Sequence, residues 1–259
     1  MVSSMTRLIL QLAKNDFKKR YAGSALGALW AFLQPIVTVV MYYLVFEVVG
    51  RGALRAGNDV PYVLYLTAGL VPWFYFSEAL PQGTAACLEY AYLVKKVVFP
   101  IDILPVVKVL GASVIHCFFV LVLLVIALIF GYPPSPAWIQ LPYYSFALCF
   151  LILGLSYCFS AVVVFFRDLS QIIGIALQIG MWATPILWDI AVLSPKWQAV
   201  FRLNPLTYIV NGYRGALYGN AWFFQEPSLT AYFWTVSTLV FLFGIWTFQR
   251  LKPHFADVL

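Results

Sequence analysis

The stretch that decides the fold class is KVLGASVIHCFFVLVLLVIALIF, residues 108–130. It contains a single charged residue, and a helix of this length crosses the roughly 30 Å hydrocarbon core of a bilayer. Five further apolar runs are long enough to do the same, at 28–49, 61–80, 142–166, 171–192 and 229–249. Gly174, Gly180 and Pro185 interrupt the fifth of the six runs, so a kink or a break is expected there. The sequence therefore predicts an all-α membrane protein with six transmembrane helices.

The composition argues against most other classes of protein. Of the 259 residues, 63% are hydrophobic and only 10% are charged, and the mean hydropathy is +0.88. A soluble domain is usually about 45–50% apolar and about 25% charged. Disorder needs low hydrophobicity and high charge. The net charge of +6 does not form a dense basic face, so nucleic acid is not an expected partner.

Familiar catalytic and metal-binding motifs are absent from the sequence. It has no GxxxxGK[ST] phosphate loop, no HExxH or GxSxG motif and no paired Cys/His spacing. The four cysteines, Cys87, Cys117, Cys149 and Cys158, fall mostly in apolar runs and are expected to be small buried side chains. We therefore expect no catalytic residue and no metal site in this chain.

Ionisable residues are scarce inside the predicted spans. Glu78 is the only acid well inside one of them, and His116 is expected to be a hydrogen-bonded helix residue. Proton-driven carriers usually keep ionisable groups at mid-membrane, so the energy for any transport is expected to come from outside this chain. Two other hypotheses stay open: a passive channel, and a membrane-embedded transferase that would depend on Glu78 and His116.

The distribution of positive charge predicts the orientation. Six spans place both termini on one side of the membrane. Eleven of the sixteen Lys and Arg residues then fall on the side of the termini, and five fall on the other. Because basic residues favour the cytoplasmic side, the N-terminus and the C-terminus are both predicted to be cytoplasmic.

The first 27 residues are predicted to form an amphipathic interface helix rather than a signal peptide. Apolar residues recur on one face at Met5, Leu8, Ile9, Leu12, Ala13 and Phe17. Polar residues occupy the other face at Arg7, Gln11, Lys14 and Lys18. Such a helix lies in the membrane interface, or packs on a partner as a soluble helix.

The loop at 88–107, LEYAYLVKKVVFPIDILPVV, is too polar to span the membrane and is predicted to be cytoplasmic. It is amphipathic and is bounded by Pro100 and Pro105. A short helix here would dock on a cytoplasmic partner. The alternative is an ordinary basic loop that contacts anionic lipid.

The segment 193–228 lies on the outer side in this topology, yet it is rich in aromatic residues. Asn204 and Pro205 fit the cap and the first position of a helix. An apolar stripe at helical spacing follows, at Leu206, Ile209, Val210, Tyr213 and Leu217. Such a helix would dip back into the outer leaflet or cover the mouth of a pore, or would lie on the outer surface.

Five segments in order resemble the ABC-2 type permeases that export bacterial polysaccharide, and among them most closely the exporters of O-antigen, capsule and teichoic acid. The segments are RYAGSALGALWAFLQPIVTVVMYYLVF (20–46), LTAGLVPWFYFSEAL (66–80), LVKKVVFPIDILPV (93–106), FFRDLSQIIGIALQIGMWATPILW (165–188) and LNPLTYIVNGYRGALYG (203–219). Together they extend over most of the chain, so the resemblance implies a single ABC-2 transmembrane domain over residues 1–259.

The resemblance implies one subunit of a larger machine. The chain would form a homodimer in the bacterial cytoplasmic (inner) membrane and pair with two copies of a separate ATP-binding subunit. ATP and Mg would be bound there, so this chain would carry no cofactor and would not itself be an enzyme. The cargo would be a polysaccharide linked to polyprenyl pyrophosphate, or alternatively a drug or a small lipid.

The resemblance also assigns roles to segments. The coupling helix that receives the ATPase stroke would comprise Leu93, Val94, Lys95, Lys96, Val97, Val98, Phe99 and Pro100. The periplasmic gate helices, between the fifth and sixth spans, would include Asn204, Pro205, Tyr208, Tyr213 and Arg214. The first and fifth spans would line the channel.

Two residue sets are candidates for contact with the cargo. A pyrophosphate needs cations at the cytoplasmic entrance, and the candidates are Lys18, Lys19, Arg20 and Lys95. Their alternative role is contact with lipid headgroups. Aromatic rings can hold a sugar polymer weakly at many sites, and the candidates are Trp30, Phe32, Tyr42, Tyr43, Trp182 and Trp188. Core packing and interface anchoring stay open for each ring.

Overall fold

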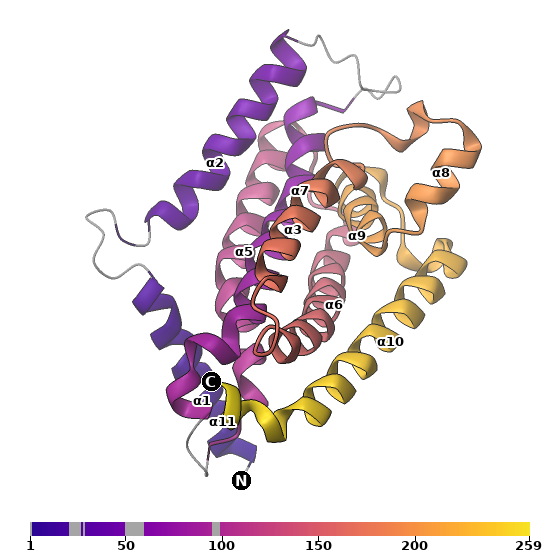
Figure 1. The fold of residues 1–259 in the computed structure, drawn as a ribbon. Coiled ribbons are helices and arrows are strands. Elements are labelled where there is room, and N and C mark those ends of the chain that lie inside the picture. Colours follow the sequence, from indigo (N-terminus) through magenta and orange to yellow (C-terminus); the bar gives the residue numbers. More distant parts are fainter. Residues whose placement is uncertain (1, 21–26, 28, 50–59, 95–98) are drawn as a thin grey trace.

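The computed structural model describes residues 2–20, 27, 29–49, 60–94 and 99–259, without the side chains of 2–4, 17, 19, 20, 47 and 49. Every regular element in these ranges is helical, as the composition predicts. The two termini lie at the same end of the bundle, and helices α8 and α9 lie at the opposite end (Figure 1). This arrangement is consistent with an even number of membrane crossings.

Five of the described helices are long and apolar enough to cross a membrane, and each coincides with a predicted span. They are α2 (Leu29–Tyr43) with its π-helical extension η1 (Leu44–Val49), α3 (Tyr62–Glu89), α5 (Ile103–Ile129), α6 (Gln140–Val162) preceded by the turn η2 (Pro136–Ile139), and α10 (Pro227–Leu251). The multi-pass fold is therefore confirmed to this extent.

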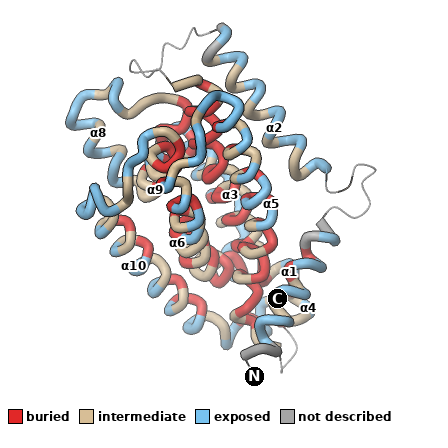
Figure 2. The backbone as a smooth tube through the Cα atoms, turned by 180° about the vertical axis from the view of Figure 1, so that it is seen from behind, coloured by how far each residue is buried: buried red, intermediate tan, exposed pale blue. Residues whose placement is uncertain are grey.

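The helix α3 forms the centre of the bundle. It packs against α2, α5, α6, α7 and α9, and 78% of its candidate membrane window is buried. Figure 2 shows most buried residues on α3 and on the neighbouring α5, α6 and α9. By contrast, α2 has no buried residue and stands to one side of the bundle (Figure 1).

The ends of two spans differ from the prediction, which placed them at residues 80 and 108. The helix α3 continues to Glu89, and α5 begins at Ile103. An apolar run marks only the part of a helix that contacts hydrocarbon, so helices that extend beyond the bilayer are longer than the run. Between them, α4 (Ala91–Val94) forms a single turn. Pro105 belongs to the first turn of α5, where a missing N–H is harmless.

The fifth predicted span is broken. The helix α7 (Leu169–Ala183) has 15 residues, which gives about 22 Å of length and falls short of the bilayer core. Thr184 is extended, with φ −105° and ψ 134°, as expected for a residue before proline. Pro185 therefore ends the helix, whereas Gly174 and Gly180 remain helical.

The segment between α7 and α10 contains five short elements. They are η3 (Ile190–Val192), α8 (Pro195–Arg202), α9 (Pro205–Arg214), its π-helical continuation η4 (Gly215–Gly219) and η5 (Phe223–Gln225). The predicted apolar stripe of α9 is buried against α3 and α6. The helix therefore inserts into the bundle instead of lying on its outer surface.

The amphipathic character of α1 (Val2–Arg20) is confirmed by burial. Leu8, Ile9 and Leu12 are half-buried, Ala13 is buried, and the predicted polar residues are exposed. The apolar face packs on α5, where Ala13 meets Ile103 and Val107. At the other end of the chain, η6 (Lys252–His254) and α11 (Phe255–Val258) follow α10.

Candidate functional site

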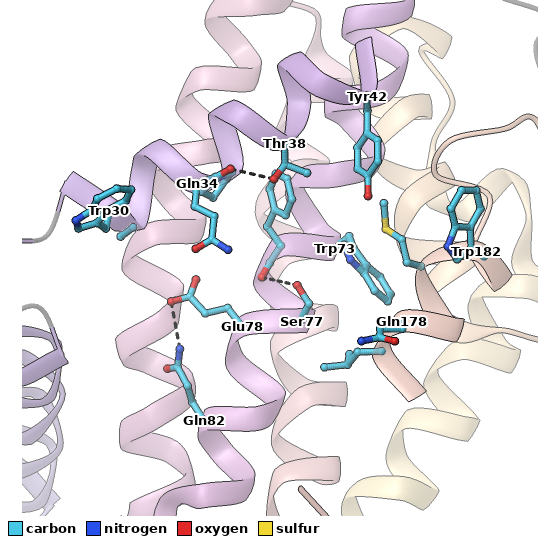
Figure 3. A pocket seen from close by; sticks show the side chains of 15 residues that line it. Trp30, Gln34, Thr38, Tyr42, Trp73, Ser77, Glu78, Gln82, Gln178 and Trp182 are labelled. Atoms are coloured by element: carbon cyan, nitrogen blue, oxygen red, sulfur yellow. Dashed lines mark hydrogen bonds between the residues drawn. The ribbon is translucent and has the colours of Figure 1, made fainter. Parts of the chain in front are cut away.

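A cleft of about 710 Å³ lies between α2, α3 and α7. Its wall contains indole rings and carboxamides, and each of the three helices supplies one indole and one carboxamide. The indoles are Trp30, Trp73 and Trp182, and the carboxamides are Gln34, Gln82 and Gln178. Thr38, Tyr42, Ser77 and Glu78 add hydroxyl and carboxylate groups. Figure 3 shows these side chains around the cleft.

Helical spacing brings indole and amide together on two of the helices. Trp30 and Gln34 are four residues apart on α2, and Gln178 and Trp182 are four apart on α7, so each pair shares one helix face. An indole offers an apolar ring face, and a carboxamide offers two donors and an acceptor. This combination suits a ligand that has both C–H faces and hydroxyl groups.

The central helix supplies the third wall of the cleft. Trp73 lies between Tyr42 and Gln178 in Figure 3. A Cβ at Gly180 would lie 3.1 Å from its ring, so that glycine leaves room for the indole against α7. One turn beyond, Gln82 Nε2 donates to Glu78 Oε1 at 3.2 Å. Glu78, noted in the sequence as the lone acid inside a span, thus belongs to the cleft.

Three of the six aromatic residues predicted to line a channel line the cleft, and three do not. Trp30, Tyr42 and Trp182 are in its wall. Phe32 packs edge-on against Phe118 of α5, with ring centroids 4.5 Å apart. Tyr43 packs against the core.

Trp188 is the third aromatic residue that lies outside the cleft wall. Its ring meets Phe201 at 5.1 Å, and its Nε1 donates to the carbonyl of Trp182 at 3.2 Å. It therefore supports the end of α7.

The sequence did not predict that Trp73 and the polar residues line a cleft. A signal was available in the indole–amide spacing on α2 and α7, because a glutamine inside an apolar run has to face something other than lipid. Trp73 gave no such signal, because the room for its ring is left by Gly180 on a different helix.

Arg214, predicted as a gate residue, holds the break after α7. It is only 7% exposed, and its Nη1 and Nη2 donate to the carbonyls of Pro185 (2.6 Å) and Ile186 (2.8 Å). Its guanidinium lies 3.6 Å from the centre of the Tyr65 ring. A Cβ at Gly69 would lie 3.1 Å from Nη2, so glycine leaves room there for the close approach.

The same break is capped by two tyrosines of α3. Tyr62 donates to the carbonyl of Leu187 at 3.1 Å, and Tyr65 donates to that of Trp188 at 2.9 Å. Four consecutive carbonyls are thus satisfied by side chains of α3 and α9. Irregular backbone at membrane depth is tolerated only with such partners.

The other predicted gate residues fasten α9 to its surroundings. Asn204 caps the helix by accepting from the Leu206 amide at 3.0 Å, and its Nδ2 donates to Thr184 Oγ1 at 2.9 Å. Pro205 occupies the first helical position. The Tyr208 hydroxyl lies 2.9 Å from that of Tyr143 on α6.

Tyr213 joins a buried polar cluster around His116. Its hydroxyl lies 3.0 Å from His116 Nε2 and 2.6 Å from Ser145 Oγ. The imidazole stacks on Tyr75, with ring centroids 4.5 Å apart. The prediction that His116 is a hydrogen-bonded helix residue is confirmed. This cluster ties α9 to α3, α5 and α6.

The predicted coupling helix is described only at its ends. Leu93 and Val94 belong to α4, and Phe99 and Pro100 lead into α5. Lys95, Lys96, Val97 and Val98 lie outside the described residues. Of the entrance cations, Lys18 is exposed on α1. The side chains of Lys19 and Arg20, and the whole of Lys95, are not described.

A buried ionic network lies at the base of α5, next to the coupling segment. Lys108, 3% exposed, binds Asp16 of α1 at 2.5 Å and also contacts Glu89 at the end of α3. The Tyr90 hydroxyl donates to Asp16 Oδ1 at 2.8 Å. Burial raises the pKa of Tyr90, and this hydrogen bond raises it further, so the phenol stays a proton donor at physiological pH. The ion pair between Asp16 and Lys108 was not predicted from the sequence.

Comparison with known proteins agrees with the sequence resemblance. Residues 7–218 match the ABC-2 type transporter family. An O-antigen export system permease protein RfbA of Myxococcus xanthus is 29% identical over 96% of this chain and 94% of its own. A protein of the same name in Klebsiella pneumoniae is 26% identical over 97% and 95%. The polysialic acid transport protein KpsM of Escherichia coli is 22% identical over 78% of each chain. Because the family match extends over most of its length, this chain belongs to the ABC-2 type transporter family.

Proposed function

We propose that this chain is the channel-forming subunit of an ATP-driven exporter that moves a lipid-linked polysaccharide across the bacterial inner membrane. The observation that carries the proposal is the cleft between α2, α3 and α7, where each helix presents an indole and a carboxamide. Sugar rings stack on indoles through their C–H faces, and their hydroxyls pair with amides. The relatives that match the whole chain are named as O-antigen export permeases.

A homodimer would complete the channel. The helices α2 and α7 border the cleft and expose large apolar residues in the single chain: Leu33, Val37 and Val40 on α2, and Ile172, Ile175 and Ile179 on α7. A second copy packed against these faces would place two clefts opposite each other. The polymer would then pass between the copies, along the first and fifth spans.

The energy would come from a separate ATP-binding subunit at the cytoplasmic end. Both termini, α1 and α4 lie at one end of the bundle (Figures 1 and 2), which supports a topology with both termini inside. Residues 93–100 would form the coupling helix at this end. ATP and Mg would be bound by two copies of the partner.

The pyrophosphate of the lipid carrier would meet the cations near the end of α1. Lys18 is exposed there, and Lys19, Arg20 and Lys95 are its proposed companions. A charge-assisted hydrogen bond to phosphate is about twice as strong as a neutral one. The cleft would bind the sugars weakly, and the entrance would bind the headgroup more tightly. Weak binding in the cleft would let the polymer keep moving.

Two alternatives make different predictions. A drug or small-lipid exporter would share the fold and the ATP-binding partner but would not need a series of sugar-binding groups. A membrane-embedded transferase would need Glu78 and His116 in one cavity. Glu78 lines the cleft, whereas His116 is held by Tyr213 and Ser145 and is not part of its wall.

The test combines co-purification with an export assay. The tagged chain is purified in mild detergent from its own cells, and its gene is used to complement a strain that lacks its O-antigen permease. We expect an ATP-binding subunit at a one-to-one ratio and restored polymer at the cell surface. An associated ATPase without polymer export would favour the drug or lipid exporter, and no ATPase at all would overturn the proposal.

Removal of an indole from the cleft is expected to slow the polymer. Trp182 is 60% exposed in the single chain and has its ring at the cleft wall. Because an aromatic contact is worth about 0.5–1.5 kcal/mol, Trp182→Ala should reduce the export rate about 3–10-fold at normal protein level. Trp246→Ala, at an exposed indole on α10 outside the cleft, is the matched control. Equal export by both variants would remove Trp182 from the polymer path.

A charge in the coupling segment is expected to separate ATP hydrolysis from export. Val98→Asp should insert into the membrane normally and hydrolyse ATP with its partner, but export little polymer, because an acid disrupts an apolar docking face. The measurement is ATP hydrolysis and polymer export on the same membrane vesicles. Val258→Asp, at an exposed site on α11, serves as the control. Normal export by Val98→Asp would show that residues 93–100 are not the coupling helix.

A further inference from the structure

The Lys108 ammonium joins three separate elements. Asp16 comes from α1, Glu89 from the end of α3, and Lys108 itself from the first turns of α5. The carboxylate of Asp16 also accepts from Tyr90, whose ring lies 5.1 Å from the ammonium. The network therefore connects these three elements next to Tyr90, directly before the coupling segment, which begins within α4.

The burial of this network is unusual for charges near a membrane surface. The side chains of Lys108 and Asp16 are 4% and 7% exposed, whereas that of Glu89 is 53% exposed. An ion that is removed from water must be held firmly by its partner, because an unpaired buried charge is costly. The Asp16–Lys108 pair is therefore a fixed contact between α1 and α5, while Glu89 can remain in water.

The far end of the coupling segment is held differently. Asp102 binds Lys252 of η6 at 2.5 Å and Gln249 of α10 at 2.9 Å, and these ions are about one-third exposed. This contact connects the segment to the C-terminal helices through a looser, solvated pair. The Asp16–Lys108 pair is therefore the more rigid of these two connections.

We propose that the Asp16–Lys108 pair is the joint that makes α1, the end of α3 and the base of α5 move together when the coupling segment is displaced. This inference rests on the proposed function. Both residues are positioning residues, because they touch neither cargo nor nucleotide. The joint transmits displacement of the coupling segment to the entrance helix α1, which carries the exposed Lys18.

The first experiment uses the complex of this chain with its ATP-binding subunit in proteoliposomes. The variants are Lys108→Met, which keeps the length of the side chain, and Asp16→Asn, which keeps an acceptor for Tyr90. We expect ATP hydrolysis within about twofold of the unmodified complex and polymer exported per ATP reduced about 5–150-fold, the range of allosteric couplings. Lys14→Met, at an exposed lysine on the polar face of α1, is the matched control.

A cross-link distinguishes a joint from a merely stabilising pair. A Cβ at Gly111 of α5 would lie 3.9 Å from the carbonyl oxygen of Ala13 of α1, so the two helices pass close to each other here, and cysteines at these two positions are first tested for disulfide formation. Ala13→Cys with Gly111→Cys is placed in the Lys108→Met chain, with the four natural cysteines replaced. Oxidation should restore polymer export per ATP, and reduction should abolish the rescue.

Each result bears on the proposal. Normal export per ATP in both Lys108→Met and Asp16→Asn would overturn it, as would a complete cross-link without rescue. If Lys108→Met does not fold, Asp16→Asn with the same cysteine pair decides the question in the same way. Failure of the unmodified complex to export polymer would instead overturn the proposed function, so the two failures are distinguishable.

Discussion

Arg214→Met is expected to abolish export and to lower the free energy of unfolding by about 3–5 kcal/mol. Methionine keeps much of the apolar volume but removes both donors from the carbonyls of Pro185 and Ile186. Each charge-assisted hydrogen bond is worth about 1.5–3 kcal/mol, and a buried carbonyl left without a donor adds to the loss. Without Arg214, Tyr62 and Tyr65 still bind the carbonyls of Leu187 and Trp188, but those of Pro185 and Ile186 lose these two donors.

The measurement for Arg214 is unfolding by SDS titration, together with polymer export in cells. Arg202→Met is the matched control, because Arg202 is exposed at the end of α8 and should change stability by no more than about 0.5 kcal/mol. Arg214→Lys should fall between the two, since an ammonium cannot reproduce the planar fork of a guanidinium. Unchanged unfolding of Arg214→Met would show that the two tyrosines of α3 hold the break alone.

Gly244→Ala is expected to destabilise the bundle strongly, by about 3 kcal/mol. A Cβ at Gly244 of α10 would lie 2.1 Å from the carbonyl oxygen of Gly154 of α6, and a Cβ at Gly154 would lie 2.8 Å from the backbone of Phe241. The two helices touch backbone to backbone, as small residues permit between membrane helices. A methyl group forces them apart and loosens the packing along their whole length.

Gly174→Ala provides the opposite expectation with the same chemical change. Nothing lies within 4 Å of a Cβ built at Gly174 in α7, so alanine should be neutral or should stabilise the helix by about 0.5–1 kcal/mol. Thermal unfolding in detergent should show a Tm lower by roughly 5–10 °C for Gly244→Ala only. Equal Tm values for the two variants would contradict the close contact of α6 and α10.

Much of the fold could be predicted because it depends on local patterns. Apolar runs located five described spans, and the face of α1 that packs on α5 followed from helical spacing. The pair Asn204–Pro205 gave the start of α9, because capping depends on neighbouring residues only. Of the six aromatic residues proposed to line a channel, Trp30, Tyr42 and Trp182 border the cleft, and their role in a channel stays a prediction.

The remainder depends on contacts between distant residues. Asp16 and Lys108 are 92 positions apart, and nothing in either local pattern indicates the other. Trp188 is an indole like Trp182, and only its contacts with Phe201 and with the carbonyl of Trp182 place it outside the cleft wall. Phe32 is two residues from Trp30, so helical spacing already places it on another face of α2. Pro185, and not the two glycines, breaks the fifth span, because glycine weakens a helix whereas proline cannot continue it.

The central helix α3 has a consequence for the biogenesis of the protein. Its most apolar window has a mean hydropathy of 1.2 and is 78% buried, whereas the corresponding values for α5 are 3.0 and 33%. A nascent segment leaves the translocon for lipid according to its own apolar character, and an acid such as Glu78 opposes this step by up to about 3 kcal/mol. The strongly apolar α5, which is synthesised next, supplies the missing affinity. The two helices would therefore enter the bilayer as a hairpin, only after residue 129 has left the ribosome.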